Sequence, residues 1–479
     1  MKIGQPTLPA PILTPIIKPW ISALVTDKVK LSELVTKYDS PINIYNKSEF
    51  HHNIQTFQNL ANELELDLGV FFARKANKSK TFVTEAKAAG IGVDTASYQE
   101  VKDCLDEGLP ADQIVLTAAI KNRKLLSFAV QNEVLIVLDN RDELDLLAQV
   151  CDEQNKSCRV ALRISGFLFE DARPTRFGFV MEEAYELLTQ DFIEKEAYSP
   201  FQFQGFHFHI NGYSIKERST ALTQAIQLSD QLQEKDIEVK FIDIGGGFLI
   251  NYLEHKSEWE AFHEQLIKSV SKKAEPITFQ NDPLGMLYHQ GEIIGKPKVY
   301  PYYNECAKDV FLRKIVESNF DGETKIFEAL KSRGIQLRIE PGRSLLDQSG
   351  ITVAEVVFRK TNSTGTNFVG LAMNRTQLKS SSEDFLLDPI FIPLTEVEDE
   401  NSEDYSCYLV GSYCLEQELI LKRRIDLPHK PAVGDLICFV NTAGYMSHFY
   451  ESQAHLLPLS KNIFFENEAD FEGDVADVY

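Results

Sequence analysis

The chain has 479 residues, a formal net charge of −22 at pH 7 and 43% hydrophobic residues. A chain of this length usually forms more than one domain, and we expect two. The acidic excess argues against nucleic acid as a partner, because like charges repel the phosphate backbone. The seven cysteines include no Cys-x-x-Cys pair. This favours reduced thiols and a cytoplasmic location over a disulfide framework.

Two further classes of protein are disfavoured. No apolar run in the sequence reaches the roughly 18 residues that a membrane-spanning helix needs. Prolines interrupt the apolar N-terminal segment 8–17, so we expect neither a signal peptide nor a membrane partner. The histidines show no metal-ligand spacing, and we therefore expect no metal.

Short apolar runs alternate with helical patterns between residues 46 and 345. We expect strands at 69–73, 91–94, 114–117, 134–138, 159–164, 204–210, 239–244 and 336–340. Eight strands at this spacing predict an α/β fold, a (β/α)8 or TIM barrel. Residues 249–335 are too long for an ordinary crossover and form an expected insertion. The insertion either shapes the active site or lies on the surface without contacting substrate.

The pattern changes after residue 345. Short β-rich runs at 350–360, 368–372, 405–411 and 435–440 are separated by turns, which predicts an all-β domain over 346–465. Residues 466–479 carry six acidic residues and are expected to form a flexible acidic tail.

Lys75 ends the first predicted strand of the barrel, in Phe-Phe-Ala-Arg-Lys. A buried ammonium is costly unless it is paired, and a lysine with a lowered pKa is the group that forms a Schiff base with a carbonyl. The alternative is a lysine whose charged end simply reaches solvent at the strand end.

Two later segments are typical of a phosphate site. Three glycines, Gly245, Gly246 and Gly247, directly follow one strand, and Glu-Pro-Gly-Arg (340–343) ends another. Glycines bring backbone N–H groups close to an anion, and Arg343 offers a planar fork for phosphate oxygens. Each segment has an alternative, a flexible turn or a surface arginine. As the seventh and eighth strands of a TIM barrel, however, they precede the two loops that usually hold phosphate.

Three more motifs complete a familiar pattern: Gly-Val-Asp-Thr-Ala-Ser (92–97), Ala-Leu-Arg-Ile (161–164) and Gly-Phe-His-Phe-His-Ile-Asn-Gly (205–212). With Lys75 and the phosphate segments, they resemble the fold-type III pyridoxal-phosphate-dependent decarboxylases. This family has an alanine-racemase-like barrel and holds the diaminopimelate, ornithine and arginine decarboxylases. The resemblance runs from about residue 34 to about residue 457.

The resemblance implies pyridoxal 5'-phosphate as the cofactor. Lys75 falls on the Schiff-base lysine and Glu340 on the carboxylate that faces the pyridine nitrogen. The other cofactor-binding positions implied are Asp94, Arg163, His209, Gly245, Gly246, Gly247, Arg343 and Tyr445. His209 is the residue expected to stack on the ring. Tyr445 also has a structural reading, as a core or interface aromatic.

The family's domain plan and assembly are implied in the same way. Residues 1–45 are expected to join the β domain, so that the barrel of residues 46–345 is inserted into it. A homodimer with shared active sites is implied, in which the Cys414 loop reaches the partner's site and Cys414 donates the proton to Cα. A lone cysteine, however, is most often a buried structural residue.

The expected reaction is decarboxylation at Cα of an amino acid. The related racemases place an arginine at the ring nitrogen, whereas this chain has Glu340. In the family an acidic residue usually follows the cysteine, but here Leu415 follows and Glu416 comes next. Glu416 is therefore the candidate substrate-binding residue. No arginine for a distal carboxylate is evident, so we expect a diamino acid or an amino-acid conjugate, such as a siderophore-type intermediate. The alternatives are an amino-acid racemase and a catalytically inactive cofactor-binding homologue.

Overall fold

The structure is a computed structural model that describes residues 9–169, 175–395, 404–467 and 470–473. Contacts divide the chain into two units. The first, here the β unit, holds residues 1–50, 250–305 and 346–479; the second, here the barrel unit, holds residues 51–249 and 306–345. A search of the described helices finds none with the length and apolar character to cross a membrane.

The barrel unit is a closed ring of parallel strands. Its strands are β2 (Leu68–Ala73), β3 (Gly92–Thr95), β4 (Ile114–Leu116), β5 (Leu135–Leu138), β6 (Cys158–Ser165), β8 (Phe201–His207), β9 (Phe241–Asp243) and β12 (Gln336–Ile339). Pairing runs β5-β4-β3-β2-β12-β9-β8-β6, and β5 pairs with β6 to close the ring. The short β7 (Phe179–Val180) pairs with β6 outside the ring. All eight predicted strands and the TIM-barrel fold are confirmed.

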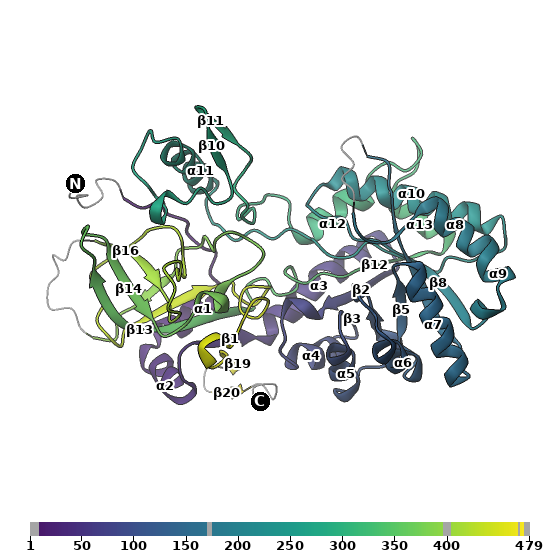
Figure 1. The fold of residues 1–479 in the computed structure, drawn as a ribbon, viewed down its shortest axis with the longest axis horizontal. Coiled ribbons are helices and arrows are strands. Elements are labelled where there is room, and N and C mark those ends of the chain that lie inside the picture. The colour runs from purple at the N-terminus through teal and green to yellow at the C-terminus, as the bar shows by residue number, and fades with distance from the viewer. Residues whose placement is uncertain (1–8, 170–174, 396–403, 468–469, 474–479) are drawn as a thin grey trace. The chain divides into compact units, whose positions relative to one another are not determined.

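Helices follow the strands and lie outside them (Figure 1). They are α3 (Lys47–Leu64), α4 (Thr81–Ala88), α5 (Tyr98–Asp106), α6 (Arg123–Gln131), α7 (Arg141–Gln154), α8 (Met181–Glu186), α10 (Ile215–Gln233), α12 (Lys308–Val316) and α13 (Ile326–Arg333). Several begin at a side-chain cap: Ser97, Asn122 and Asn140 each accept a hydrogen bond from the backbone N–H three residues later. Such caps let a helix start soon after a strand ends.

Apolar side chains fill the barrel. The cluster comprises Phe71, Val115, Leu135, Val137, Ala161 and Phe241, all less than 8% exposed. Gly205 allows β8 to lie against β9, because a Cβ at this position would overlap the carbonyl oxygen of Phe241. The C-terminal ends of the strands are thereby held in one rigid ring.

The β unit is built on a sheet that includes β1 (Ile42–Asn46), from before the barrel in sequence. β1 pairs with β13 (Gly350–Thr361) and with β19 (Lys461–Asn467). The other strands are β14 (Asn367–Leu371), β15 (Ile390–Ile392), β16 (Tyr405–Val410), β17 (Ile425–Leu427), β18 (Leu436–Val440) and β20 (Asp470–Gly473). The four predicted runs correspond to β13, β14, β16 and β18.

The expected insertion, residues 249–335, is divided between the two units. Residues 250–305 belong to the β unit. They carry α11 (Lys256–Val270) and a hairpin of β10 (Leu287–His289) with β11 (Glu292–Ile294). Backbone hydrogen bonds bind this stretch to its unit, from Phe279 N to Lys422 O and from Arg424 N to Ile277 O. Residues 306–335 belong to the barrel unit and carry α12 and α13.

The expectation of a flexible acidic tail from residue 466 is wrong for part of it. β20 pairs with β19 as an antiparallel ribbon, because Asp-Phe-Glu (470–472) alternates polar and apolar residues as a strand does. Residues 468–469 and 474–479 lie outside the described part of the chain.

Candidate active site

Functional side chains gather at the C-terminal ends of the barrel strands. Lys75 follows β2, Asp94 lies in β3, Arg163 lies in β6 and Glu340 follows β12. Parallel strands of a closed barrel end on one face, and in TIM barrels that face carries the catalytic groups. The fold therefore brings these four residues, which are far apart in the sequence, into one site.

Lys75 and Asp94 form the central pair. Lys75 Nζ lies 2.8 Å from Asp94 Oδ2, and the Thr117 hydroxyl donates to the other carboxylate oxygen. Asp94 is buried. Its burial and the nearby Glu340 charge raise the pKa of Asp94, whereas Lys75 lowers it. The pair therefore holds an amine at the barrel mouth while its carboxylate stays out of solvent.

Glu340 is a buried carboxyl group, only 2% exposed. Its Oε1 lies 3.4 Å from His207 Nε2 and has no hydrogen-bond partner in the described part of the chain. Burial raises the pKa of Glu340, and the positive charges of Lys75 and Arg163 oppose that rise. A buried acceptor without a donor is unfavourable. Glu340 is therefore suited to accept from a bound group.

Two histidines adjoin Glu340 and the glycine loop. Burial lowers the pKa of both His207 and His209 well below the ordinary value. Both are therefore neutral imidazoles at physiological pH. His209 lies beside the loop, since a Cβ on Gly245 would be 2.8 Å from its Cδ2. Neutral imidazole offers a flat, uncharged face against which an aromatic ring can pack.

The triple glycine is shaped by its neighbours. Gly245 and Gly247 have φ angles of +67° and +84°, which favour glycine. Gly245 N donates to Asp243 Oδ1, and Glu340 N donates to Gly245 O. A Cβ on Gly246 would lie 2.5 Å from the Glu340 carbonyl oxygen. Only glycine fits at position 246 without a shift of the loop, and glycine-rich loops let backbone N–H groups approach an anion closely.

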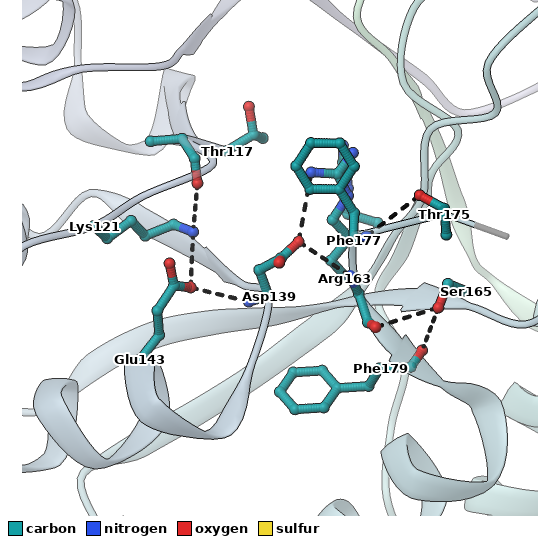
Figure 2. A network of polar contacts seen from close by, with 12 residues as sticks. Thr117, Lys121, Asp139, Glu143, Arg163, Ser165, Thr175, Phe177 and Phe179 are labelled. Carbon is teal, nitrogen blue, oxygen red and sulfur yellow. Dashed lines mark hydrogen bonds and ion pairs between the residues drawn. The ribbon is translucent and has the colours of Figure 1, made fainter.

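Arg163 is held by a carboxylate and an aromatic ring. Its Nη1 lies 3.5 Å from Asp139 Oδ1, and its guanidinium lies 4.1 Å from the centre of the Phe177 ring (Figure 2). Asp139, which directly follows β5, also accepts from Gly178 N. Asp139 therefore connects the end of β5 to Arg163 and to the segment that leads into β7.

A second lysine, Lys121, lies on the same side of the barrel and is buried. Lys121 Nζ lies 2.9 Å from Glu143 Oε2 and donates to the Ala118 carbonyl oxygen (Figure 2). Glu143 also accepts from Asp139 N. Burial lowers the pKa of Lys121, but Glu143 opposes this. Its pairing with Glu143 makes Lys121 a structural group.

Sequence reasoning missed His207, Asp243 and Asp139. His207 and Asp243 lie with the predicted Glu340 in a cluster whose potential donor and acceptor atoms are within 4.8 Å of one another. Burial and Glu340 raise the pKa of Asp243 well above its usual range. A signal was present, since His207 and Asp243 are polar residues at the ends of buried strands. Asp139 carried the same signal.

Three of the predicted site residues, Cys414, Glu416 and Tyr445, lie in the β unit. Cys414 and Glu416 are exposed in the loop after β16, and Tyr445 is half-buried with a φ of +67°. They lie in a different unit from Lys75. Their part in the active site stays a prediction.

The barrel residues fit pyridoxal 5'-phosphate. The orphaned Glu340 Oε1 can accept from a protonated ring nitrogen. The glycine loop, which has no room for a Cβ at Gly246, suits a phosphate group. Lys75 offers the primary amine that a cofactor aldehyde needs.

Comparisons with known proteins agree with this geometry. The family model for the pyridoxal-binding domain of pyridoxal-dependent decarboxylases matches residues 51–283. A Sinorhizobium fredii protein, y4yA, is 26% identical over 451 residues, covering 93% of this chain and 92% of that protein. Diaminopimelate decarboxylase from Bacillus methanolicus is 24% identical over 459 residues, covering 91% and 90%. An L-glutamyl-[BtrI acyl-carrier protein] decarboxylase from Niallia circulans is 23% identical over 451 residues, covering 90% and 89%.

The fold is shared with solved structures as well. Diaminopimelate decarboxylase from Helicobacter pylori, complexed with L-lysine, matches with a TM-score of 0.66 and 18% identity, covering 92% of this chain and 95% of that one. For the present chain, the family model and the curated relatives imply pyridoxal 5'-phosphate as the cofactor and decarboxylation as the reaction. The comparisons support a divergent fold-type III pyridoxal-phosphate-dependent decarboxylase.

Proposed function

We propose that this decarboxylase acts at Cα of an amino-acid group carried by a larger molecule or of a diamino acid, and releases carbon dioxide and an amine. The observation that carries the proposal is the pair of Lys75 Nζ and Asp94 Oδ2, 2.8 Å apart, beside the buried carboxyl of Glu340. A lysine amine that can bind the cofactor aldehyde and a buried carboxyl group for its ring nitrogen, both at one barrel face, are the parts that this chemistry needs.

Each residue has a proposed task. When bound, the cofactor supplies the electron sink for the bond that breaks at Cα. Lys75 binds it covalently, Asp94 orients the amine, and Glu340 keeps the ring nitrogen protonated. Arg163 lies beside the cofactor and His209 packs against its ring. The remaining contacts are to the phosphate, from Gly245, Gly246, Gly247, Arg343 and Tyr445.

Two residues of the β unit are proposed to complete the site. Cys414 donates the proton that reaches Cα after carbon dioxide leaves. Glu416 binds the substrate. Both are exposed in the described chain, as side chains that reach the active site of a partner subunit would be. We therefore propose a homodimer with shared sites.

A conjugated substrate is favoured over diaminopimelate by the environment of Arg375. This arginine lies in the segment that follows β14, where the family's substrate-binding arginine is expected. Its Nη1 donates to the Gln417 carbonyl oxygen, and its Nε lies 3.6 Å from the buried Glu418 carboxylate. Because Arg375 is paired with Glu418, it is poorly placed to bind the distal carboxylate of a substrate such as diaminopimelate. The Niallia relative, which decarboxylates a glutamyl group on a carrier protein, gives a precedent for conjugates.

Carbon dioxide release tests the proposal. The purified enzyme is incubated with free diamino acids and with amino acids conjugated through an amide or thioester, and labelled carbon dioxide is counted. We expect release from a conjugate or a diamino acid. Inversion of one enantiomer without release would identify the racemase. Binding of the cofactor without either reaction would identify the inactive homologue.

A further inference from the structure

Arg218 is a fully buried cation in the first turn of α10. Its Nη2 donates to two backbone carbonyl oxygens, 3.0 Å to Ile210 and 2.8 Å to Gly212. Both belong to the loop that follows β8 and the His209 position. The guanidinium therefore holds the backbone of residues 210–212 in place by hydrogen bonds.

Arg218 has no counter-ion among the residues that the structure describes. No described carboxylate oxygen lies within 4.0 Å of the guanidinium, and its Nε and Nη1 have no hydrogen-bond partner in the same residues. Burial lowers the pKa of Arg218 to about 10, so the group is still charged at neutral pH. Because burying an unpaired charge is costly, an anion is expected nearby.

The glycine loop lies directly against this cation. A Cβ on Gly247 would be 2.5 Å from Arg218 Nη2. A second cation, Arg343, acts on the same tyrosine as Arg218. Burial raises the pKa of Tyr213, whereas the positive charges of Arg343 and Arg218 both lower it. Tyr213 therefore lies near two positive charges from different elements, Arg218 on α10 and Arg343 in the loop after β12, and Arg218 is the one that lies against the glycine loop.

We propose that Arg218 is a further residue of the phosphate site, a positioning cation behind Gly247 that holds the glycine loop and attracts the phosphate dianion. The inference rests on the proposed phosphate site and adds a residue to it. The buried charge acts at close range and in a water-poor environment, where electrostatic attraction is strong. The uncompensated cation is then neutralised by the ligand.

The phosphate preference of the apoprotein measures this role. Dissociation constants are determined for pyridoxal 5'-phosphate and for pyridoxal, which lacks the phosphate. For Arg218→Met, the constant for pyridoxal 5'-phosphate should rise by at least about tenfold, whereas that for pyridoxal stays within about threefold. If Arg218 had a purely structural role, the variant would bind both ligands more weakly by the same factor, and the ratio of the two dissociation constants would not change.

A matched control removes one positive charge elsewhere in the barrel unit. Arg333 is paired with Asp230, which lies on α10 itself, and both side chains are partly exposed. Arg333→Met should leave the ratio of the two dissociation constants as in the wild type. If the preference for pyridoxal 5'-phosphate over pyridoxal falls equally in Arg218→Met and Arg333→Met, the effect is a general one of charge, and the role of Arg218 is overturned.

A second variant keeps the test decisive if Arg218→Met does not fold. Arg218→Gln retains N–H donors for the loop carbonyl groups but carries no charge, and the phosphate preference should still fall. An unchanged preference in Arg218→Gln overturns the inference alone. A wild-type apoprotein without any preference for pyridoxal 5'-phosphate over pyridoxal would instead overturn the proposed phosphate site.

Discussion

Lys75 Nζ lies 2.8 Å from Asp94 Oδ2, and the lysine side chain is 34% exposed whereas the aspartate is fully buried. The amine is thus reachable from outside while its partner is fixed within the barrel. Asp94 can orient the amine without itself being open to solvent.

Removing the amine should remove the covalently bound cofactor. In Lys75→Ala, we expect loss of the visible absorbance of the lysine-bound cofactor and of turnover, because Lys75 supplies the primary amine that Asp94 holds at the end of β2. Lys80→Ala is the control, since Lys80 lies five residues later and pairs with Asp103. Equal cofactor absorbance in Lys75→Ala and the wild type would contradict the assignment.

Glu340→Gln should separate cofactor binding from chemistry. The amide has nearly the same volume but cannot carry the charge that keeps the ring nitrogen protonated. We expect the cofactor absorbance to remain and kcat to fall by at least about a hundredfold, or about 2.7 kcal/mol of barrier. Steady-state kinetics on the loaded variant measure this. A kcat within about tenfold of the wild type would refute the role of Glu340.

Gly246→Ala should weaken the cofactor's phosphate contacts. The added Cβ would lie 2.5 Å from the Glu340 carbonyl oxygen, so the loop has to shift. Overpacking of this kind costs about 1–3 kcal/mol, and we expect a rise of about tenfold in the dissociation constant of pyridoxal 5'-phosphate. Gly69→Ala is the control, because its Cβ would meet atoms at 3.2 Å or more. The idea fails if both variants bind the cofactor like the wild type.

The β unit should lose stability as the pH rises through neutrality. Burial raises the pKa of Asp384 to about 7, although backbone N–H groups of Lys422 and Arg423 oppose this. A carboxyl group whose folded pKa is raised stabilises the fold fully below its unfolded pKa. That stabilisation is lost progressively as the pH rises from about 4 to the folded pKa of about 7.

Asp384→Asn removes the ionisable group and keeps an acceptor. Relative to the wild type, the variant should gain stability from pH 5 to pH 8, by roughly 2.7 kcal/mol at most, because about two pH units lie between pH 5 and the folded pKa of about 7. Melting temperatures at the two pH values measure the difference. Glu383→Gln, a half-exposed neighbour that pairs with Lys422, should show no such trend. A constant difference between Asp384→Asn and the wild type would show that Asp384 does not titrate in this range.

Subunit mixing tests the shared active site. If Lys75 of one subunit works with Cys414 of another, inactive Lys75→Ala and Cys414→Ala proteins should together regain about a quarter of wild-type activity, through heterodimers with one intact site. No recovery after verified subunit exchange would place both groups in one chain. Full, clean decarboxylation by Cys414→Ala alone would remove its proposed role as proton donor.

The barrel was predictable because its strands are short apolar runs with polar residues at their C-terminal ends. Lys75, Asp94 and Glu340 follow this rule, so their convergence followed from strand order. Arg218 could not be found in this way. It lies on a helix, and only the three-dimensional packing shows that it is buried against Gly247 without a counter-ion.

The division of residues 249–335 was also beyond sequence reasoning. Its β-unit part is held by backbone hydrogen bonds such as Phe279 N to Lys422 O. Backbone pairing between distant segments leaves little trace in residue type. β20 was missed for a different reason. Its acidic residues are uncommon in strands, and the alternation of Asp470 and Glu472 with Phe471 is too short to stand out in the sequence.

The site of covalent attachment tests the central claim most directly. The purified enzyme is reduced with borohydride, digested and analysed by mass spectrometry for a lysine that carries the reduced cofactor. The account predicts the modification on Lys75. Modification of Lys121, a buried lysine on this side of the barrel, or of any other lysine would contradict it.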